Sequence, residues 1–564
     1  MIKREELPMA DKQGRLRSNF NLGGEQAEAD PLLEHAFYES SDYSTIASKF
    51  DTRCFLIGRT GSGKSAALKH LDESHPGKVV RIDPEDLSLP YIVDLQVIKY
   101  LGSLDVNLDL LFIALWKHVL LVELIRHRYK VDSPAAKQNF LSTLREKIKR
   151  DSGKAAALEY LDEFGEKFWC EADERVKEIT ERFEQKIKAE QKAHLGLSKS
   201  SIDASAGADT TFGNESKAEM TDRYQRIVNQ TQLARLNKMI DVLDDDILNS
   251  SQHQTYVVID DLDRDWVDER LSNDLIRCLF RTVLDLKKVQ HLKVLVALRT
   301  NIFRELDFGT RTGGQEEKFR SMALTIRWSA NDLENMLNER ARIAGDQFGM
   351  QVQSIRELLP ASNKSRGDAL QYMLSKTLMR PRDIISFLNE CFALSSGKDR
   401  ISWADIQSAE REYSEKRLLA LRDEWKPTYP DIQKALNVFR RITLPLQKEA
   451  FTQHLDEIML LVAERDFRGG EWVSKLSEAM WSANSNSEWT DLYQPLASLL
   501  YDIGFIGMAR KGVNNIIYSY DRPGFADSHR NLSEVEVFYI HPAYHDALEI
   551  KGDDQFRWEH RGDI

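Results

Sequence analysis

The sequence predicts an α/β protein whose mostly parallel sheet is interrupted along the chain by a large helical insertion. Three apolar runs predict the central strands, namely RCFLI at 53–57, YVVI at 256–259 and LKVLVAL at 292–298. About 200 residues separate the first run from the second, which is too long for a simple crossover between parallel strands and therefore requires inserted helices. A helical block and a C-terminal α+β region follow this core.

Changes in the sequence pattern predict six regions within the 564 residues. They are a lead-in helix region (1–50), the first half of the core (51–100), a helical insertion with a coiled-coil-like arm (101–250) and a flexible Ser- and Gly-rich tip (193–217), the second half of the core (251–327), a helical lid (328–423) and a winged-helix-like C-terminal domain (424–564). This length accommodates several packing units of roughly 100–200 residues each.

The composition is that of a soluble globular protein, with 42% hydrophobic and 30% charged residues. The net charge of −12 excludes a surface that binds polyanions over its whole extent. The four cysteines lie more than 100 residues apart, which excludes a zinc site by ligand spacing and favours a reducing cytoplasm. The start lacks the apolar core of an export signal. Because Lys117 and His118 interrupt the apolar run at 109–125, we expect a buried helix there and no membrane contact.

A glycine-rich motif, GRTGSGKS at 58–65, directly follows the first strand and precedes the helical pattern AALKHL. It fits G-x-x-x-x-G-K-[ST], in which glycines turn backbone N–H groups around phosphate oxygens and the following helix presents its positive N-terminus. We expect Lys64 to reach the β- and γ-phosphates and Ser65 to place its hydroxyl on Mg²⁺. A chance glycine turn is the alternative, and the flanking strand and helix argue against it. The nucleotide-binding candidates are Gly58, Arg59, Thr60, Gly61, Ser62, Gly63, Lys64, Ser65 and Ala66, with Lys64 also catalytic.

Acidic and polar residues end the other two strands. We expect the strand that ends in Asp260 to neighbour the loop strand, so that Asp260 holds the Mg²⁺ water shell. Asp261 is expected to polarise the attacking water as a catalytic residue. For the segment DDLDRD at 260–265, a solvated acidic loop is the alternative. The third run ends in Arg299, Thr300 and Asn301, which should lie beside the acidic strand. Arg299 is the catalytic candidate that would sense the γ-phosphate, and an ordinary polar turn is the alternative.

Together these motifs resemble the KAP and STAND types of P-loop NTPase, including related bacterial ATPases found in mobile-element and defence gene neighbourhoods. The resemblance rests on GRTGSGKS, VVIDDLDR at 257–264, LRTNIF at 298–303 and RPRD at 380–383, and more loosely on GGE at 23–25 with the helix after it. It implies ATP binding with slow hydrolysis that switches conformation or assembly. It also implies a lid in which Arg380 and Arg382 sense the bound nucleotide, and surface arginines near a helix start are the alternative. Membrane-spanning helices after the loop and repeats of roughly 20 to 50 residues, both frequent in these proteins, are missing from the sequence.

The insertion has two candidate partner-binding features. Residues 126–154 carry nine basic and three acidic side chains, a local charge of +6, for which a solvated helix face is the favoured explanation and a nucleic-acid or acidic-partner surface the alternative. Apolar residues at helical spacing predict a hairpin arm that either protrudes to bind a partner or packs against the core. These residues are Val176, Ile179, Phe183 and Ile187 in the first helix and Leu233, Leu236, Ile240, Leu243 and Ile247 in the second.

The C-terminal region combines helices with β-rich runs. Helices that end in DLYQPLASLLYDIGFIG at 491–507, followed by β-rich runs at 513–520 and 535–540, predict a winged helix with a β-hairpin. Its predicted recognition helix carries Asp491 and Asp502 and little positive charge, so we expect it to pack against protein rather than DNA. His541 and His545 lack converging ligands and are expected to be structural.

The combined prediction is a cytoplasmic ATPase that uses ATP and Mg²⁺ to switch its conformation or its assembly with a protein partner, either an effector or further copies of itself. A role in antiviral or mobile-element defence follows from the resemblance alone. Two alternatives stay open: a DNA-engaging ATPase or regulator that uses the basic insertion and the terminal wing, and an ATP-bound scaffold with little turnover. A basic residue from a neighbouring molecule could complete the nucleotide site, and the candidates for it are Arg311 and Arg320, and more weakly Lys318.

Overall fold

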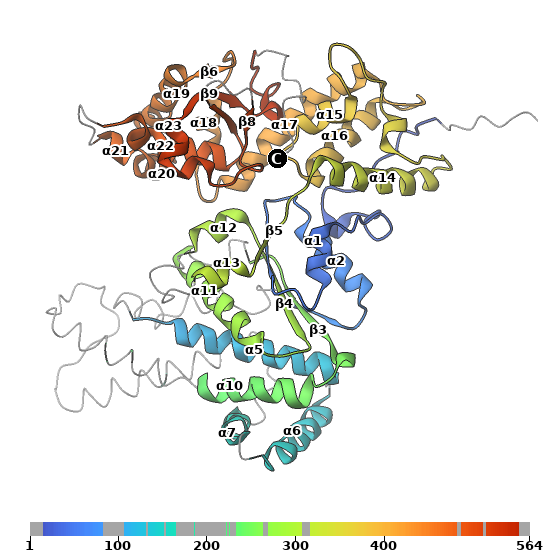
Figure 1. Cartoon of the computed structure of the whole chain (residues 1–564), viewed down its shortest axis with the longest axis vertical. Coiled ribbons are helices and arrows are strands. Elements are labelled where there is room, and N and C mark those ends of the chain that lie inside the picture. The colour runs from blue at the N-terminus through green and yellow to red at the C-terminus, as the bar shows by residue number, and fades with distance from the viewer. Residues whose placement is uncertain are drawn as a thin grey trace, which may run out of the picture. The chain divides into compact units, whose positions relative to one another are not determined.

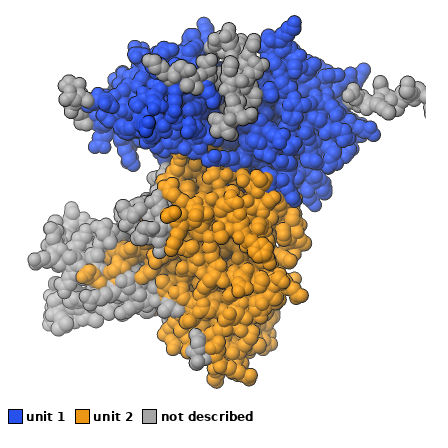
Figure 2. Space-filling view, viewed as in Figure 1, with its two compact units in different colours: residues 1–40, 60–66, 327–564 blue, residues 41–59, 67–326 orange. Residues whose placement is uncertain are grey.

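The computed structural model describes residues 15–82, 106–130, 133–151, 154–164, 233–262, 269–306, 316–481, 487–510 and 515–551, together with the single positions 185, 222 and 225. The chain forms two compact units (Figure 2). The first comprises Met1–Ser40, Thr60–Ala66 and Arg327–Ile564, and the second comprises Ser41–Arg59 and Ala67–Ile326. Most of the glycine-rich loop, Thr60–Ala66, therefore belongs to the first unit, although Gly58, Arg59 and the segments that flank the loop in the sequence belong to the second.

A five-stranded sheet, in which every pairing is parallel, forms the centre of the second unit. Its order is β2-β3-β4-β1-β5, with β1 at Phe55–Ile57, β2 at Val79–Ile82, β3 at Thr255–Ile259, β4 at Leu292–Leu298 and β5 at Ala323–Thr325. Strands β1, β3 and β4 are buried along their whole length, as expected of parallel strands covered on both faces. The predicted mostly parallel α/β core is thus confirmed.

Strand order corrects one expectation. The acidic strand β3 is not the neighbour of the loop strand β1, because β4 pairs with both and lies between them. As the longest of the three strands and fully buried, β4 takes a central place in which both of its edges are hydrogen-bonded. The expected pairing of the acidic strand with the third run is confirmed, since Ile259 lies opposite Val296.

Helices cover both faces of this sheet, with α1 and α2 on one side of the strands and α11 on the other (Figure 1). The helices that accompany the sheet are α1 (Ser41–Ala47), α2 (Lys64–Ser74), α5 (Asp109–Tyr129), α11 (Glu269–Leu286), α12 (Thr300–Glu305) and α13 (Glu316–Ser321). Phe55 of β1 stacks on Phe280 of α11 with ring centroids 3.4 Å apart. This contact packs the loop strand against the helix that connects β3 to β4.

The apolar run at 109–125 is a buried helix, as predicted. Trp116 of α5 donates from Nε1 to the Leu275 carbonyl of α11 at 3.0 Å. Lys117, buried in the same helix, pairs with Asp285 at 2.5 Å, and His118 hydrogen-bonds to Tyr160. Both residues that interrupt the apolar run therefore have a polar partner. Among the described residues, no helix combines the length and apolarity needed to cross a membrane.

The described part of the insertion packs against this core. It contains α6 (Pro134–Ile148), α7 (Ala155–Phe164) and α10 (Leu233–Val242), which a π-helical turn extends through Leu243–Ile247. Helix α10 contacts both α5 and α7, and Leu236, Ile240 and Leu243 are buried. For this helix, packing against the core is the alternative that the structure supports. The predicted first helix beyond 164 and the tip at 193–217 lie outside the described residues, apart from position 185.

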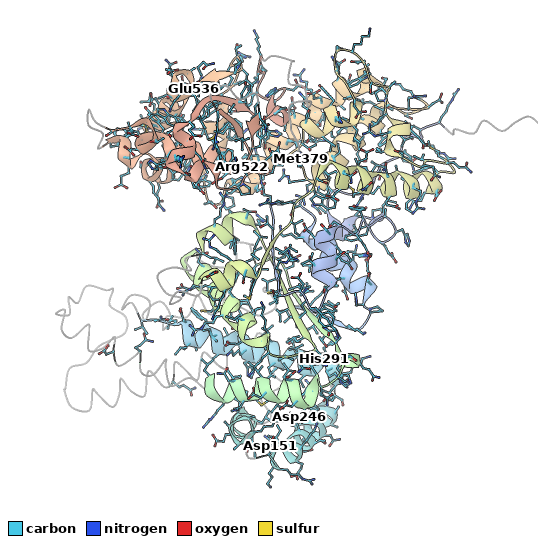
Figure 3. All side chains as sticks on the ribbon, in the orientation of Figure 1. Asp151, Asp246, His291, Met379, Arg522 and Glu536 are labelled. Carbon is cyan, nitrogen blue, oxygen red and sulfur yellow. The ribbon has the colours of Figure 1, made fainter. Side chains whose placement is uncertain are left out.

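Much of the positive charge at 126–154 is neutralised inside the second unit. Lys154 pairs with Asp245 at 3.1 Å and with Asp246 at 2.8 Å, and Lys147 pairs with Asp246 at 3.0 Å. Asp246 is labelled in Figure 3. Arg145 pairs with Asp162 at 3.1 Å. The acidic π-helical turn therefore binds two of the basic side chains that the sequence suggested for a polyanionic partner.

The first unit begins with a helical block built on α14 (Ala330–Gln347), α15 (Ala369–Ser375), α16 (Pro381–Leu394) and α17 (Trp403–Trp425). Ser329 and Asp332 form a capping box at the start of α14, and Pro381 occupies the first turn of α16. Phe20 and Leu22 of the N-terminal segment pack into the core of this block beside Leu337. Residues far apart in the sequence thus form one core.

The C-terminal part contains α18 (Ile432–Asn437), α19 (Lys448–Leu460), α20 (Gly470–Leu476), α21 (Glu478–Trp481), α22 (Trp489–Asp502) and α23 (His529–Ser533). An antiparallel sheet of order β6-β9-β7-β8 accompanies them, with β6 at Leu446–Gln447, β7 at Ile506–Arg510, β8 at Ile516–Ile517 and β9 at Val535–Ile540. The predicted hairpin between the runs at 513–520 and 535–540 is wrong, because β7 lies between them. The glycines of DIGFIG obscured this strand in the sequence.

His541 is fully buried and accepts from the Ala543 N–H at 3.1 Å, which caps the following turn. His545 hydrogen-bonds through Nε2 to the Ile540 carbonyl at 2.8 Å. Both histidines therefore have structural roles, as expected. Of the four cysteines, Cys54, Cys278 and Cys391 are buried free thiols, and Cys170 lies outside the described residues.

Gly507 gives a test of the β7–β8 pairing. We expect Gly507→Ala to lower the free energy of unfolding by about 1–3 kcal/mol, because the overpacked neighbours must move. An added Cβ would lie 2.4 Å from Cε1 of Tyr518 and 2.5 Å from Cγ2 of Ile516. Urea unfolding followed by tryptophan fluorescence measures the change. Gly470→Ala is the control, since its Cβ would meet only Val462 at 4.0 Å. Equal stabilities of the two variants would contradict this packing.

Candidate functional site

The glycine-rich loop has the strand, loop and helix order that its sequence predicted. It leaves β1 after Ile57, and α2 begins at Lys64, so Lys64 and Ser65 are the first residues of that helix. Gly61 and Gly63 have φ angles of +79° and +93°, in the left-handed region that side-chain-bearing residues rarely adopt. The two glycines therefore permit a turn that ends at a helix N-terminus, where anions are stabilised.

Three consecutive carbonyl groups of the loop accept hydrogen bonds from the helical block. Arg380 Nη1 donates to Thr60 O at 2.9 Å, the Arg382 N–H to Gly61 O at 3.5 Å, and Trp328 Nε1 to Ser62 O at 2.8 Å. The C=O and N–H of a trans peptide point in opposite directions. The N–H groups that follow these carbonyls, on residues 61–63, therefore face away from the three donors. An anion-binding loop uses backbone N–H groups that are left facing away from such anchors.

A hollow of about 120 Å³ adjoins the loop within the first unit. Pockets that enclose whole drug-sized ligands are larger, about 300–1,000 Å³. Three parts of the unit line it: loop residues Gly61, Gly63, Lys64, Ser65 and Ala66; the helical-block residues Arg340, Pro381, Arg382 and Ile385; and the N-terminal residues Gly24, Glu25, Ala27, Glu28, Asp30 and Leu33.

A buried ion pair fixes the N-terminal wall of the hollow. Asp30 accepts from Arg340 Nη1 at 2.8 Å through Oδ2 and from the Gly24 N–H at 3.0 Å through Oδ1. Arg340 also donates to the Leu22 carbonyl at 2.7 Å. Both partners are buried, so removing either one would leave an uncompensated charge. The GGE string that the sequence associated loosely with the site is thus part of its wall.

The two arginines flanking Pro381 have different surroundings. Arg380 is buried, pairs with Asp383 at 3.0 Å and with Glu424 at 3.5 Å, and donates to the loop. Burial works to lower the pKa of Arg380, but the two carboxylates outweigh this and raise it. Arg382 lines the hollow and donates from Nε to the Glu25 carbonyl at 3.1 Å. Burial, and then the like charge of Arg380, lower the pKa of Arg382. A bound anion would relieve that repulsion.

The remaining candidates lie in the second unit. Asp260 and Asp261 directly follow β3, and the Asp261 N–H donates to Asp260 Oδ1 at 2.9 Å. Asp261 has a φ of +59°, a conformation that costs energy for a residue with a side chain. Arg299 follows β4 and precedes α12. Because β1, β3 and β4 are parallel, these residues and Gly58 all follow strands at the same edge of the sheet.

Other candidates divide between described and undescribed regions. Lys318 and Arg320 belong to α13, whereas Arg311 and the Asp263-Arg264 end of the DDLDR string lie outside the described residues. Sequence reasoning missed Trp328 as a loop contact and missed Glu424, which accepts from the Thr60 N–H at 3.3 Å. Nothing local marks either residue, because each is more than 260 positions away from the loop.

Comparison with known proteins gives several similarities. Residues 331–422 match the family described as the FunZ-associated C-terminal helical domain, which corresponds closely to α14–α17. The Escherichia coli (strain K12) protein named "Putative transposon gamma-delta 80.3 kDa protein" is 22% identical over 554 residues, covering 94% of this chain and 67% of that protein. Allergen Alt a 2 of Alternaria alternata is 27% identical over 151 residues, covering 26% of this chain and 76% of that protein.

Among solved structures, the Aeropyrum pernix ORC1 protein in complex with DNA matches with a TM-score of 0.31 and 11% identity, over 92% of this chain and 94% of that one. The resemblance to KAP and STAND proteins specifically stays a prediction.

Asp383 gives a test of the arginine network. Burial alone would raise its pKa, but the Arg380 and Arg417 guanidiniums outweigh this and hold the pKa well below the usual range. We expect Asp383→Asn to lower the free energy of unfolding by about 3–5 kcal/mol, because it leaves buried arginines without their carboxylate. Urea unfolding measures this, with the exposed Asp399→Asn as control.

The same variant has a defined pH dependence. A carboxylate whose folded-state pKa is depressed stabilises the fold above its unfolded pKa of about 3.9 and loses that contribution below it. The stability difference between the wild type and Asp383→Asn should therefore stay constant from neutral pH down to about pH 5 and shrink below about pH 4. A difference that shrinks already between pH 7 and pH 5 would contradict the depressed pKa.

Proposed function

We propose that the chain is an ATP-binding and ATP-hydrolysing molecular switch that couples its nucleotide state to conformation or to assembly with a partner protein. The observation that carries this proposal is the anchored loop. Two left-handed glycines and three bound carbonyls orient its amide groups, and the loop ends in Lys64 and Ser65 at a helix N-terminus beside Arg382. This set matches what a phosphate chain requires: amide donors, a lysine, a hydroxyl and an arginine.

Each candidate residue has a role in this proposal. Lys64 and Arg382 bind phosphate oxygens, and Arg380 supports the loop without touching the nucleotide. Ser65 and Asp260 supply the hard oxygen ligands that Mg²⁺ prefers, and the metal would neutralise charge on the transferred phosphate. Asp261 orients the attacking water, and Arg299 responds to the γ-phosphate.

The biological setting is proposed from two sources. The resemblance to bacterial defence ATPases suggests an antiviral or mobile-element role. Similarity to the transposon gamma-delta protein, along most of this chain, supports a link with mobile elements. The nature of the partner follows from neither source, and an effector protein or a second copy of the chain would both fit a switch.

A DNA-engaging function through the basic stretch has less support. Lys147 and Lys154 are paired with carboxylates of the same unit, so binding a phosphate backbone there would require breaking these pairs. Salt-dependent retention of DNA at low ionic strength would favour that alternative over the protein-coupled switch.

Substitutions in the loop and the acidic strand test the proposal. We expect the wild type to bind and hydrolyse ATP, and Lys64→Ala to lose ATP binding. Asp261→Asn should keep binding and lose turnover by about 10²–10⁴-fold, the usual contribution of a general base. Calorimetry and phosphate release measure the two properties, and exposed Lys78→Ala is the control. A wild type that does not bind ATP would overturn the proposal, and unchanged turnover in Asp261→Asn would overturn the role of that residue alone. Binding with negligible wild-type turnover would favour the scaffold alternative.

The two arginines of α16 should separate binding from stability. Arg382→Gln is expected to weaken ATP binding roughly 10–150-fold, because a charged hydrogen bond contributes about 1.5–3 kcal/mol, while urea unfolding changes little. Arg380→Gln should instead lower the free energy of unfolding by about 3–5 kcal/mol, because it breaks a buried ion pair. The two variants control for each other. Similar effects on both measurements would contradict the different roles assigned to these residues.

A further inference from the structure

One residue of the loop, Thr60, is held on both of its backbone polar groups by a single ion pair. Its N–H donates to Glu424 Oε1 at 3.3 Å, and its carbonyl accepts from Arg380 Nη1 at 2.9 Å. Glu424 Oε2 in turn lies 3.5 Å from Arg380 Nη1, and the two side chains are only 10% and 9% exposed. Because low exposure strengthens charged hydrogen bonds, this pair fixes the loop residue next to Gly61.

Glu424 belongs to a helix that two hydrophobic cores share. The first half of α17 contributes Ile406 and Tyr413 to the core of the helical block. Its second half contributes Leu421 and Trp425 to the core of the C-terminal part, in which α18 and α19 also take part. Close-packed cores transmit displacement rather than absorb it. A shift of Glu424 would therefore move side chains in the C-terminal core.

The same helix holds two other elements. Arg417 pairs with Asp383 at 2.9 Å and with Glu25, in the wall of the hollow, at 3.2 Å. Ser414 Oγ donates to the Ala543 carbonyl at 2.8 Å and accepts from the Ala547 N–H at 3.1 Å. Helix α17 thus contacts the loop, the N-terminal wall and the C-terminal end of the described chain.

We propose that Glu424 and Arg380 are a positioning pair that fixes Thr60 and couples occupancy of the loop to the C-terminal core through α17. This inference rests on the proposed ATP binding by the loop. Glu424 brings a negative charge to a loop that is proposed to bind anions, where a neutral oxygen could also accept from the N–H. Because of this charge, a phosphate that binds to the loop repels the Glu424 carboxylate and attracts its partner Arg380. The hydrogen bonds of this pair to Thr60 therefore respond to phosphate binding.

Glu424→Ala and Glu424→Gln, made in the full chain, test the proposal. Glu424→Ala should weaken ATP binding by about tenfold or more, because Thr60 loses its acceptor. Glu424→Gln keeps an acceptor oxygen and should restore the affinity to within about threefold of the wild type. The matched control is Asp423→Ala on the same helix, whose carboxylate is 48% exposed and pairs with Arg422 and Lys426. This control should bind ATP as the wild type does.

Amide hydrogen exchange of α18 and α19 at saturating ATP measures the coupling. ATP should change exchange there in the wild type and in Asp423→Ala, and the change should be lost in Glu424→Ala. A role confined to stability would raise exchange with and without ATP and leave the ATP-dependent difference intact.

If the wild type binds ATP and Glu424→Ala matches Asp423→Ala in affinity and exchange, the positioning pair is overturned while ATP binding stands. If the wild type binds no ATP, both proposals fall. If Glu424→Ala does not fold, Glu424→Gln tests the coupling instead, because the coupling requires the carboxylate charge of Glu424. The ATP-dependent change in amide exchange of α18 and α19 should then be smaller in Glu424→Gln than in Asp423→Ala. An equal change in the two variants overturns the proposal.

Discussion

The first unit depends on one fully buried carboxylate, that of Asp383. It accepts from the Leu378 N–H and from Arg380 Nε, both at 3.0 Å, and from Arg417 Nη1 at 2.9 Å. A buried charge is tolerated only when its partners are complete, so these bonds fix the two guanidiniums. Arg380 then points to the loop and Arg417 to the N-terminal wall. Met379, which is labelled in Figure 3, lies between Leu378 and Arg380. Its φ is +53°. Such a strained residue persists where its surroundings determine the backbone, as the bonds to Asp383 do here.

This network explains why the glycine-rich loop groups with the helical block. Its carbonyls at residues 60–62 are bound by α16 and by Trp328, which precedes α14, whereas its flanking residues belong to the sheet unit. The candidates at Thr60–Ala66, Arg380 and Arg382 therefore belong to one unit, and Gly58, Arg59, Asp260, Asp261 and Arg299 belong to the other.

The sequence predicted those parts of the fold that leave a local signal. Strands β1, β3 and β4 are fully apolar runs, and the loop has a fixed spacing between a strand and a helix. Strands β2 and β5 were not singled out, because VVRI and ALT are short and each includes an exposed residue. The contacts of Trp328 and Glu424 with the loop are long-range and leave no periodic trace. Nor could the sequence separate Arg380 from Arg382, because the direction of each depends on its partners at the start of α16.

The energetics of the loop connect these observations. A glycine pays more conformational entropy on ordering than other residues, so a loop with Gly61 and Gly63 would be costly to order when an anion binds. Three hydrogen bonds from the helical block, each contributing about 0.5–1.5 kcal/mol, offset this loss of conformational entropy before an anion binds. Gly61 is constrained twice, by its φ of +79° and by Arg382, whose Cβ would lie 2.8 Å from any added Cβ. The close approach that demands glycine also brings the Arg382 side chain against the loop. Loop and helical block therefore form one element whose geometry depends on contacts from both parts.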